Sequence, residues 1–391
     1  MVKQIDCMNM SHPLLSLRTL LFPIIVVVFT LSWGACSTPS SGEHSLPGDT
    51  VHMRHSSLLT IVECDGYTVV DVKNPWSGKR LKRYVLVSKE EQLPETAPSG
   101  TLVRVPLDNV LLFSGVHALL LEELGVIDAV GGVCDAQYMY CDAVSSRLQS
   151  GAVTDCGSSL NINSELVMQV NPEAVFVLPY ENGGYGKLEK MKYPLVECAD
   201  YMESSPLGCA EWVRFYGRLL GVGEKADSLF FAVCENYYRI KARVDSCATR
   251  PRLMCELKTG SAWYMPGGGS TMGQLYRDAG ADYLFGNNDN SGSVPYSFET
   301  VLARADSADV WLVKYGADKD KSYSSLEQEF SGYTLLRSFR ERRIFACNVS
   351  RKRFYEETPF RPDILIEELA SLLHPELNDD YELRYYEKMQ E

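Results

Sequence analysis

Two stretches of this chain, separated by roughly the length of a domain, share one pattern. They are "NSELVMQVNPEAVFVL" at 163–178 and "SFETVLARADSADVWLV" at 297–313. In both, a Glu (Glu165, Glu299) opens an apolar run with helical spacing, an Ala follows nine places later, and a short apolar strand closes the unit. A repeat at this distance indicates two similar lobes rather than a solenoid of short units.

Strands and helices alternate on both sides of a long helical stretch. The first side contains "NVLLFS", "VHALLLEELG" and "VIDAVGGV", and the second contains "RLMCEL", "ADVWLV" and "RIFACN". This alternation is typical of parallel βαβ units in a doubly wound sheet. The stretch between them, "EKADSLFFAVCENYYRIKARV", has helical periodicity and no Gly or Pro. We therefore predict an α/β fold of two doubly wound lobes joined by a long rigid helix, with a ligand cleft between the lobes.

The boundaries of these parts follow from composition and turn signals. "LLTIVECDGYTVVDV" and "RLKRYVLV" flank the turn-forming "KNPWSGK", which predicts a hairpin at the edge of the first lobe. The predicted organisation is a signal peptide (1–35), a lipidated tether (36–56), an N-terminal α/β lobe with the edge hairpin (57–222), a bridging helix (223–247), a C-terminal α/β lobe (248–378) and a charged tail (379–391).

The first residues have the features of an export signal. Basic residues precede the apolar run "TLLFPIIVVVFTL" (19–31), which is too short to span a bilayer comfortably, and small residues precede Cys36. The polar, Pro- and Gly-containing run after Cys36 is typical of a flexible tether. The arrangement resembles a bacterial lipoprotein signal, in which Cys36 becomes the lipid-modified N-terminus, although Trp33 stands where Leu is commonest. The alternative is a plain secretory peptide with an incidental Cys.

Charge and cysteine spacing exclude other classes. The formal net charge of -13 argues against a nucleic-acid partner, because such proteins neutralise phosphates with clustered Lys and Arg. The cysteines show no short-spaced Cys or His pairs, so a structural zinc site is not indicated. We expect several of them to pack as small hydrophobes. Cys134 and Cys141 are the pair closest to a disulfide spacing, with free thiols as the alternative.

A glycine run offers one candidate binding loop. "PGGGS" (266–270) leads into a predicted helix, where Gly268 would allow close backbone approach and Ser270 would stand at the helix N-terminus, facing an anionic group of a ligand. A tight strand-to-helix turn is the alternative. The run lacks the Lys-Ser/Thr ending of a nucleotide-binding loop.

Aromatic and basic side chains gather in other predicted loops. Aromatic rings at the edge of a cleft suit flat ligands, and Arg beside Tyr suits carboxylates or catecholates. Packing between lobes, or a solvated loop, is the alternative for each. The candidate ligand-binding residues of this kind are Tyr138, Tyr140, Tyr185, Trp263, Tyr264, Arg353 and Tyr355.

Nothing in the sequence forms a coherent catalytic set. There is no Gly-x-Ser-x-Gly elbow and no His-Glu-x-x-His, and His117 near Ser114 is the one pair that could meet in the cleft. We therefore expect no enzyme activity and no cofactor. The competing class is an exported enzyme that processes metal chelates.

The residues from about 58 to 377 resemble a known family. With the two repeated units, the stretches "ESSPLGCAEWVRFYGRLLG", "GGGSTMGQLYRDAGADYLF" and "RPDILIEELASLLHPEL" resemble substrate-binding lipoproteins of bacterial ABC importers, of the class that delivers ferric siderophores, haem and cobalamin. The resemblance implies a monomer in the periplasm, anchored to the membrane by lipid, that hands a small metal complex to an ABC permease dimer in the inner membrane.

The resemblance also gives the repeated Glu a role. In the family an acidic residue on each lobe pairs with Arg on each half of the permease, and Glu165 and Glu299 occupy the matching positions. One anion per lobe suits a two-fold partner. The alternative is a Glu in the first turn of a helix, where the dipole favours it by ~0.3–1 kcal/mol.

The resemblance leaves several ligands open. Haem would favour a His or Tyr axial ligand, cobalamin a stacking residue such as Trp263, and a ferric siderophore Arg353 with Tyr355. We rank an iron complex, siderophore or haem, first because basic and aromatic loop residues occur together. Cobalamin is the alternative.

Overall fold

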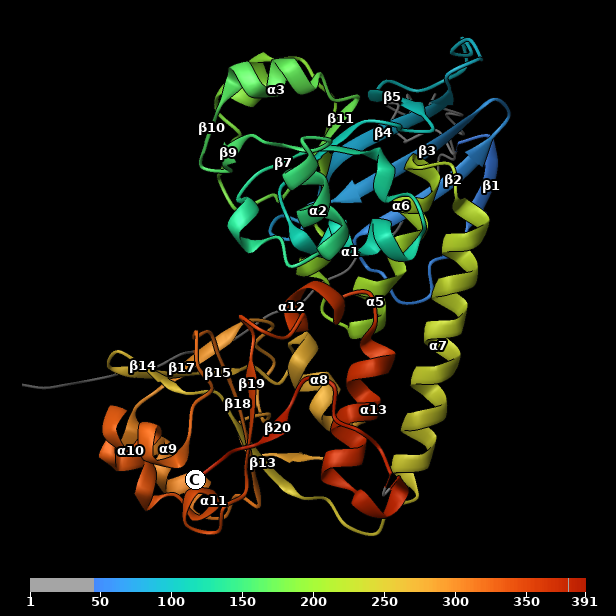
Figure 1. Cartoon of the computed structure of the whole chain (residues 1–391). Helices are drawn as coiled ribbons and strands as arrows, with labels where there is room; N and C mark the ends of the chain where they lie inside the picture. Colours follow the sequence, from blue (N-terminus) through green and yellow to red (C-terminus); the bar gives the residue numbers. More distant parts are fainter. Residues whose placement is uncertain (1–45, 379) are drawn as a thin grey trace, which may run out of the picture. The chain divides into compact units, whose positions relative to one another are not determined.

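The computed structural model describes residues 46–378 and 380–391 (Figure 1). The predicted signal peptide and the start of the predicted tether, with Cys36, lie outside the described residues. None of the helices in the described ranges is long and apolar enough to cross a membrane.

The chain begins with a mixed five-stranded sheet that is larger than the predicted hairpin. Its strands run in the order β1-β2-β3-β4-β5, antiparallel except for the parallel pair β4 and β5. The predicted hairpin is present as β3 and β4, but the run before it folds back at Gly66, whose φ of 77° permits the turn, and forms two strands. The strands are β1 (Gly48–Val51), β2 (Leu59–Cys64), β3 (Tyr67–Lys73), β4 (Arg80–Ser88) and β5 (Thr101–Val105).

The N-terminal lobe contains the predicted parallel sheet, in the order β12-β11-β6-β7-β8. Its strands are β6 (Val110–Leu112), β7 (Val130–Val133), β8 (Thr154–Asp155), β11 (Ala174–Val177) and β12 (Leu195–Glu197). A short ladder of β9 (Gly157–Ser158) and β10 (Asn161–Ile162) lies beside it. The helices of this lobe are α1 (Gly115–Glu123), α2 (Asp142–Ser150), α3 (Ser164–Val170), α4 (Lys187–Lys190), α5 (Pro206–Glu211) and α6 (Val213–Leu219).

The C-terminal lobe repeats this plan with the order β16-β13-β18-β19-β20, where only β20 is antiparallel. The strands are β13 (Arg252–Cys255), β16 (Asp282–Tyr283), β18 (Val310–Tyr315), β19 (Ile344–Asn348) and β20 (Glu387–Lys388). A second, antiparallel sheet consists of β14 (Lys258–Thr259), β15 (Ala262–Pro266) and β17 (Ser293–Tyr296). The helices are α8 (Thr271–Asp278), α9 (Phe298–Ala305), α10 (Tyr323–Glu329), α11 (Arg337–Arg340), α12 (Phe354–Glu357) and α13 (Pro362–Leu373).

The predicted bridging helix is α7 (Gly223–Asp245), which runs alongside both lobes in Figure 1. It packs against α6 of the N-terminal lobe and α13 of the C-terminal lobe. Its buried side chains recur every three or four residues, as expected for an amphipathic helix that buries one face. They are Ala226, Phe230, Val233, Tyr237, Ile240 and Val244.

The charged tail packs on the C-terminal lobe. The carboxylate of Glu368, on α13, is fully buried and accepts backbone N–H groups of Arg384, Tyr385 and Tyr386. Both tyrosines are buried in consequence. The tail therefore reaches β19 as β20 and completes the sheet.

Two buried carboxylates fix the segment that enters the first sheet. Glu211 accepts the backbone N–H groups of residues 54–56 at 2.8–3.0 Å. Glu203 accepts those of Ser57 at 3.0 Å and Leu58 at 3.1 Å. These N–H groups make no hydrogen bonds to a neighbouring strand. The carboxylates of Glu211 and Glu203 accept their hydrogen bonds instead.

We predict that Glu203→Ala lowers the free energy of unfolding by about 3 kcal/mol or more, because several buried donors lose a charged acceptor. Urea titration of the purified protein measures the change. Glu165→Ala, at an exposed position, is the matched control and should change stability by no more than about 0.5 kcal/mol. Equal effects of the two variants would contradict the assigned role of Glu203.

Candidate functional site

A cavity of about 520 Å³ lies between the N-terminal and C-terminal lobes. On the N-terminal side it is lined by residues that follow β6, β11 and β12 and by Pro206 and Cys209 of α5. On the C-terminal side it is lined by α8, α13 and the segment before α13. Open α/β sheets bind ligands at the carboxyl ends of their strands, and the volume is within the range of small-molecule sites, about 300–1,000 Å³.

Short connections after the strands place the side chains of the N-terminal wall. Ser114 follows β6 and caps α1, accepting the N–H of Val116 at 3.3 Å, which sets His117 on the first turn. Leu178 and Tyr180 follow β11, and both are partly exposed in the cavity wall. This wall is therefore largely apolar.

The C-terminal wall depends on the start of α8. Ser270 caps this helix, accepting the N–H of Gly273 at 3.0 Å. The next residues, Thr271 and Met272, with Leu275 one turn later, line the cavity. Pro362 and Leu365 of α13, together with Thr358 and Pro359, complete this wall.

Two polar side chains of the cavity lining, His117 and Asp200, are buried and lie against one another. The His117 side chain is 1% exposed, and its Nε2 lies 3.2 Å from Oδ1 of Asp200. The hydroxyl of Tyr216, on α6, donates to the same oxygen at 2.6 Å. Burial by itself lowers the pKa of His117, but Cys198 and the Asp200 carboxylate outweigh it and raise the pKa to about 10. His117 and Asp200 therefore form a buried, hydrogen-bonded pair in the cavity lining.

The described residues that line the cavity include no Lys or Arg. Two arginines near the lobe boundary pair with acids across it. Arg361 contacts Glu123 across the boundary at 2.7 Å and Asp363 of its own lobe at 2.9 Å, and Arg353 pairs with Asp142 across the boundary. The described lining of the cavity is thus without Lys or Arg, and its one acid, Asp200, is paired with His117.

The predicted aromatic loops of the N-terminal lobe lie outside the cavity. Tyr138 and Tyr140 are exposed in the loop after β7. Tyr185 is half-buried, donates its hydroxyl to Glu197, and lines a neighbouring pocket that shares Leu178 and Tyr180 with the cavity. The structure therefore brings only Tyr185 close to the cavity.

The prediction that Trp263 contacts a ligand is wrong in this structure. Its side chain is fully buried, its Nε1 donates to the Cys255 carbonyl at 3.1 Å, and its ring packs on Trp311. Side chains alternate along β15, so Trp263 points into the core and Tyr264 points to solvent, 48% exposed. Tyr264 does not line the cavity either.

The glycine run forms the tight turn that was the alternative interpretation. The N–H of Gly268 donates to the Asn288 side chain at 3.1 Å, and an added Cβ would meet the Gly286 carbonyl oxygen at 1.9 Å. Gly268 and Ser270 are both buried, and neither lines the cavity. Their role is to place α8.

The remaining predicted residues also lie apart from the cavity. Tyr355 is 52% exposed, and neither it nor Arg353 lines the cavity wall. Cys134 and Cys141, the candidate disulfide, are free, as are the other cysteines in the described ranges. Glu165 and Glu299 are exposed in the first turns of α3 and α9 and do not line the cavity.

Sequence reasoning missed Asp200, Tyr201 and the α13 residues. A signal for Asp200 was available, since it stands three residues after β12, where polar side chains of a cleft are expected. His117 and Ser114, which the sequence suggested as a cleft pair, both line the cavity. No comparable signal marks Pro362 or Leu365.

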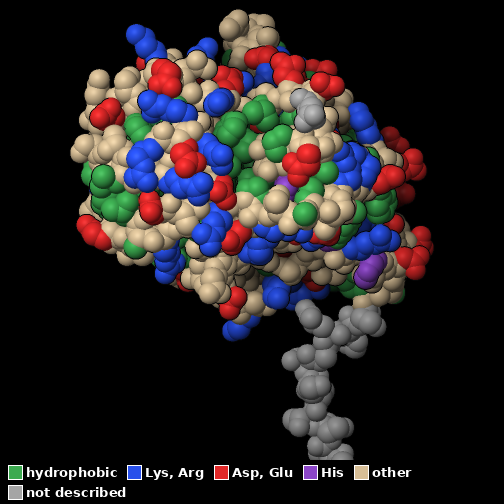
Figure 2. Space-filling view, turned by 90° about the horizontal axis from the view of Figure 1, so that it is seen from below, with side chains coloured by type: hydrophobic (Ala, Val, Ile, Leu, Met, Phe, Trp, Pro, Cys, Tyr) green, Lys and Arg blue, Asp and Glu red, His purple; other side chains and the backbone are tan. Residues whose placement is uncertain are grey.

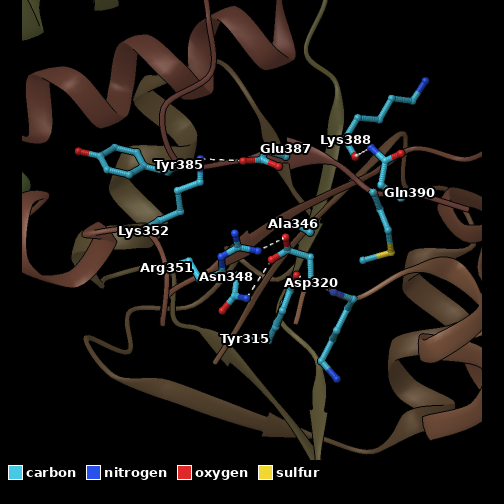
Figure 3. Close-up of a pocket in the computed structure, with 12 residues that line it drawn as sticks. Tyr315, Asp320, Ala346, Asn348, Arg351, Lys352, Tyr385, Glu387, Lys388 and Gln390 are labelled. Carbon is cyan, nitrogen blue, oxygen red and sulfur yellow. Dashed lines mark hydrogen bonds and ion pairs between the residues drawn. The ribbon is translucent and has the colours of Figure 1, made fainter. Parts of the chain in front are cut away.

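A second pocket, of about 320 Å³, lies at the carboxyl ends of β18 and β19 (Figure 3). Arg351 pairs with Asp320 at 2.6 Å, and Lys352 pairs with Glu387 at 2.7 Å. These charges satisfy one another, and only the C-terminal lobe contributes to this pocket. The interlobe cavity is therefore the better candidate for ligand binding.

Charged side chains of both signs are mixed over the face in Figure 2. This mixture contrasts with the basic stripe of a nucleic-acid-binding surface. The absence of a nucleic-acid partner stays a prediction.

Comparison with known proteins gives a consistent result. Residues 113–349 match the model of a family described as Periplasmic binding protein. An uncharacterized lipoprotein of Methanocaldococcus jannaschii is 25% identical over 332 residues, which cover 78% of each chain.

Solved structures share the fold. An ABC-type Fe3+-hydroxamate transport system from Saccharomonospora viridis has a TM-score of 0.53 at 18% identity, covering 69% of this chain and 94% of that one. A periplasmic heme binding protein, HutB, of Vibrio cholerae has a TM-score of 0.55 at 13% identity, covering 68% and 99%. At these identities the likeness shows the fold alone.

Proposed function

The chain belongs to the periplasmic binding protein family, and we propose that it captures a ferric iron complex and delivers it to the permease of an ABC importer. The observation that carries the proposal is the cavity between the two α/β lobes, with walls from both. The fold neighbours described as binding haem and as transporting Fe3+-hydroxamate support an iron complex.

The charge of the cavity favours an electrically neutral complex. A ligand with net charge loses its hydration on entering a largely apolar cavity and needs an opposite charge there. The described lining includes no Lys or Arg, and its one acid, Asp200, is paired with His117. A ferric trihydroxamate is neutral, because three singly charged hydroxamates offset Fe3+. Trianionic catecholate complexes, and haem with its two propionates, lack basic partners here.

Cobalamin is the second candidate. It carries no excess negative charge, so the same cavity would accept it by the charge criterion. The stacking residue suggested for it, Trp263, is buried in the core, which removes the sequence argument in its favour.

The family and fold are those of substrate-binding proteins, which are not enzymes. His117, Cys198 and Asp200 lie together, as a nucleophile, base and orienting acid would. The Cys198 thiol, however, is fully buried, burial raises its pKa, and it does not line the cavity. A nucleophilic cysteine needs a thiolate that can reach substrate.

Delivery would use the two repeated acids and a lipid anchor. Glu165 and Glu299, one per lobe and both exposed, offer a two-fold permease one anion on each half. Lipid on Cys36 would hold this protein, as a monomer, at the outer surface of the membrane, which the lipoprotein name of the archaeal relative supports.

We predict that the processed protein binds ferrichrome, a neutral ferric trihydroxamate, at least about tenfold (1.4 kcal/mol) more tightly than ferric enterobactin, which is trianionic. Quenching of intrinsic fluorescence measures both affinities, with haem and cobalamin as further ligands. Met272→Trp, which fills the cavity, should abolish binding. Met168→Trp, on the exposed face of α3, is the matched control and should not.

A preference for the trianionic complex would contradict the charge argument. Tightest binding of cobalamin would move the assignment to the second candidate.

We predict that Glu165→Ala with Glu299→Ala leaves ligand affinity unchanged but slows permease-dependent uptake. The difference from the unmodified protein should be largest at low ionic strength, where exposed charges are least screened. Uptake into proteoliposomes that contain the permease measures the effect. Glu181→Ala with Glu327→Ala changes one exposed acid on each lobe and should leave uptake normal. If both double variants behave alike, the two repeated acids do not dock.

A further inference from the structure

One side-chain cluster beneath the cavity is not used by the proposed function. A ring nitrogen of His117, the thiol of Cys198 and a carboxylate oxygen of Asp200 lie within 4.8 Å of one another. They come from the first turn of α1 and from the segment that follows β12. All three residues are buried.

We propose that this cluster binds a transition-metal ion directly, with one coordination position open to the cavity. The set of one nitrogen, one sulfur and one oxygen matches Zn2+ or Co2+, which bind imidazole, thiolate and carboxylate in tetrahedral sites. Three protein ligands and an open fourth position is the arrangement of metal sites that exchange a ligand.

The ring nitrogen of His117 that faces the cluster is Nε2. It lies 3.2 Å from Oδ1 of Asp200 and 3.2 Å from the Tyr216 hydroxyl. An ion at the cluster would replace this His117–Asp200 contact by binding Nε2 and the carboxylate at once.

The surroundings fit a metal site as well. The Tyr216 hydroxyl holds Asp200 at 2.6 Å, as outer hydrogen bonds hold metal-ligating carboxylates. His117 and Asp200 line the cavity, which gives an ion a route in and places the open position where a bound molecule would sit. Ligation requires neutral His117 and a Cys198 thiolate, so protons leave as the ion binds.

The test uses Zn2+ and Co2+ alone, on the processed protein freed of metal by a chelator. We expect one ion per chain after gel filtration, measured by mass spectrometry of the metal. The Co2+ form should show a thiolate-to-cobalt charge-transfer band. Cys198→Ser should abolish that band and the retained ion.

A second cluster provides the matched control. Cys247, His374 and Glu376 form the other such group among the described residues, at the far end of α7, where Glu376 is exposed. Cys247→Ser should leave both readouts unchanged. Loss of the ion with Cys247→Ser and its retention with Cys198→Ser would overturn the assignment, as would failure to retain any ion.

A conservative variant keeps the test valid if Cys198→Ser does not fold. Tyr216→Phe retains every proposed ligand and removes only the hydroxyl that holds Asp200. It should weaken Co2+ binding by about 10–100-fold, and an unchanged affinity would contradict the proposal. Because no chelate is added, failure of ferrichrome binding would leave this result unaffected.

Discussion

The apolar face of α7 is the constraint on which the arrangement of the two lobes depends. The helix is 23 residues and therefore about 34 Å long, and it packs against α6 at one end and α13 at the other. Side chains as large as Phe230 and Tyr237 contribute about 1.5–3 kcal/mol each when fully buried. Neither lobe can leave this helix without exposing that surface, so the separation of the two sheets is set by its length.

The cavity follows from that separation. The carboxyl ends of β6, β11 and β12 face α8 and α13 across it, and the Arg361–Glu123 pair spans the boundary at 2.7 Å. The two arginines beside the boundary, Arg353 and Arg361, pair with Asp142 and Glu123 and do not line the cavity. The described lining of the cavity is therefore without Lys or Arg, which disfavours an anionic ligand.

The fold could be predicted from the sequence because its signals are local. The periodicity of apolar residues and the repeated unit are visible in short windows, and they indicated the two α/β lobes and the long helix correctly. The first sheet was predicted only in part: the turn at Gly66 divides one β-rich run into β2 and β3, and β1 lies within the predicted tether.

The residues of the site could be predicted only in part, because tertiary packing decides which side chains of a strand or loop are buried and which reach the cavity. Trp263 and Tyr264 are adjacent and equally aromatic, and only packing of the β15 sheet decides that the first is buried. The sequence allowed two roles for Gly268, a ligand-binding loop or a tight turn. The backbone carbonyl of Gly286, which leaves no room for a Cβ at Gly268, shows the tight turn. Asp200 and Leu365 are far apart in the sequence and line the same cavity only because the two lobes pack on α7.

The binding site is tested most directly by a crystal structure of the protein with bound ferrichrome, with an anomalous difference map recorded at the iron absorption edge. We expect a single iron peak inside the interlobe cavity, between Tyr180 of the N-terminal lobe and Met272 of the C-terminal lobe. An iron peak in the pocket beside Tyr315 and Asn348, or on the surface of one lobe alone, would contradict it.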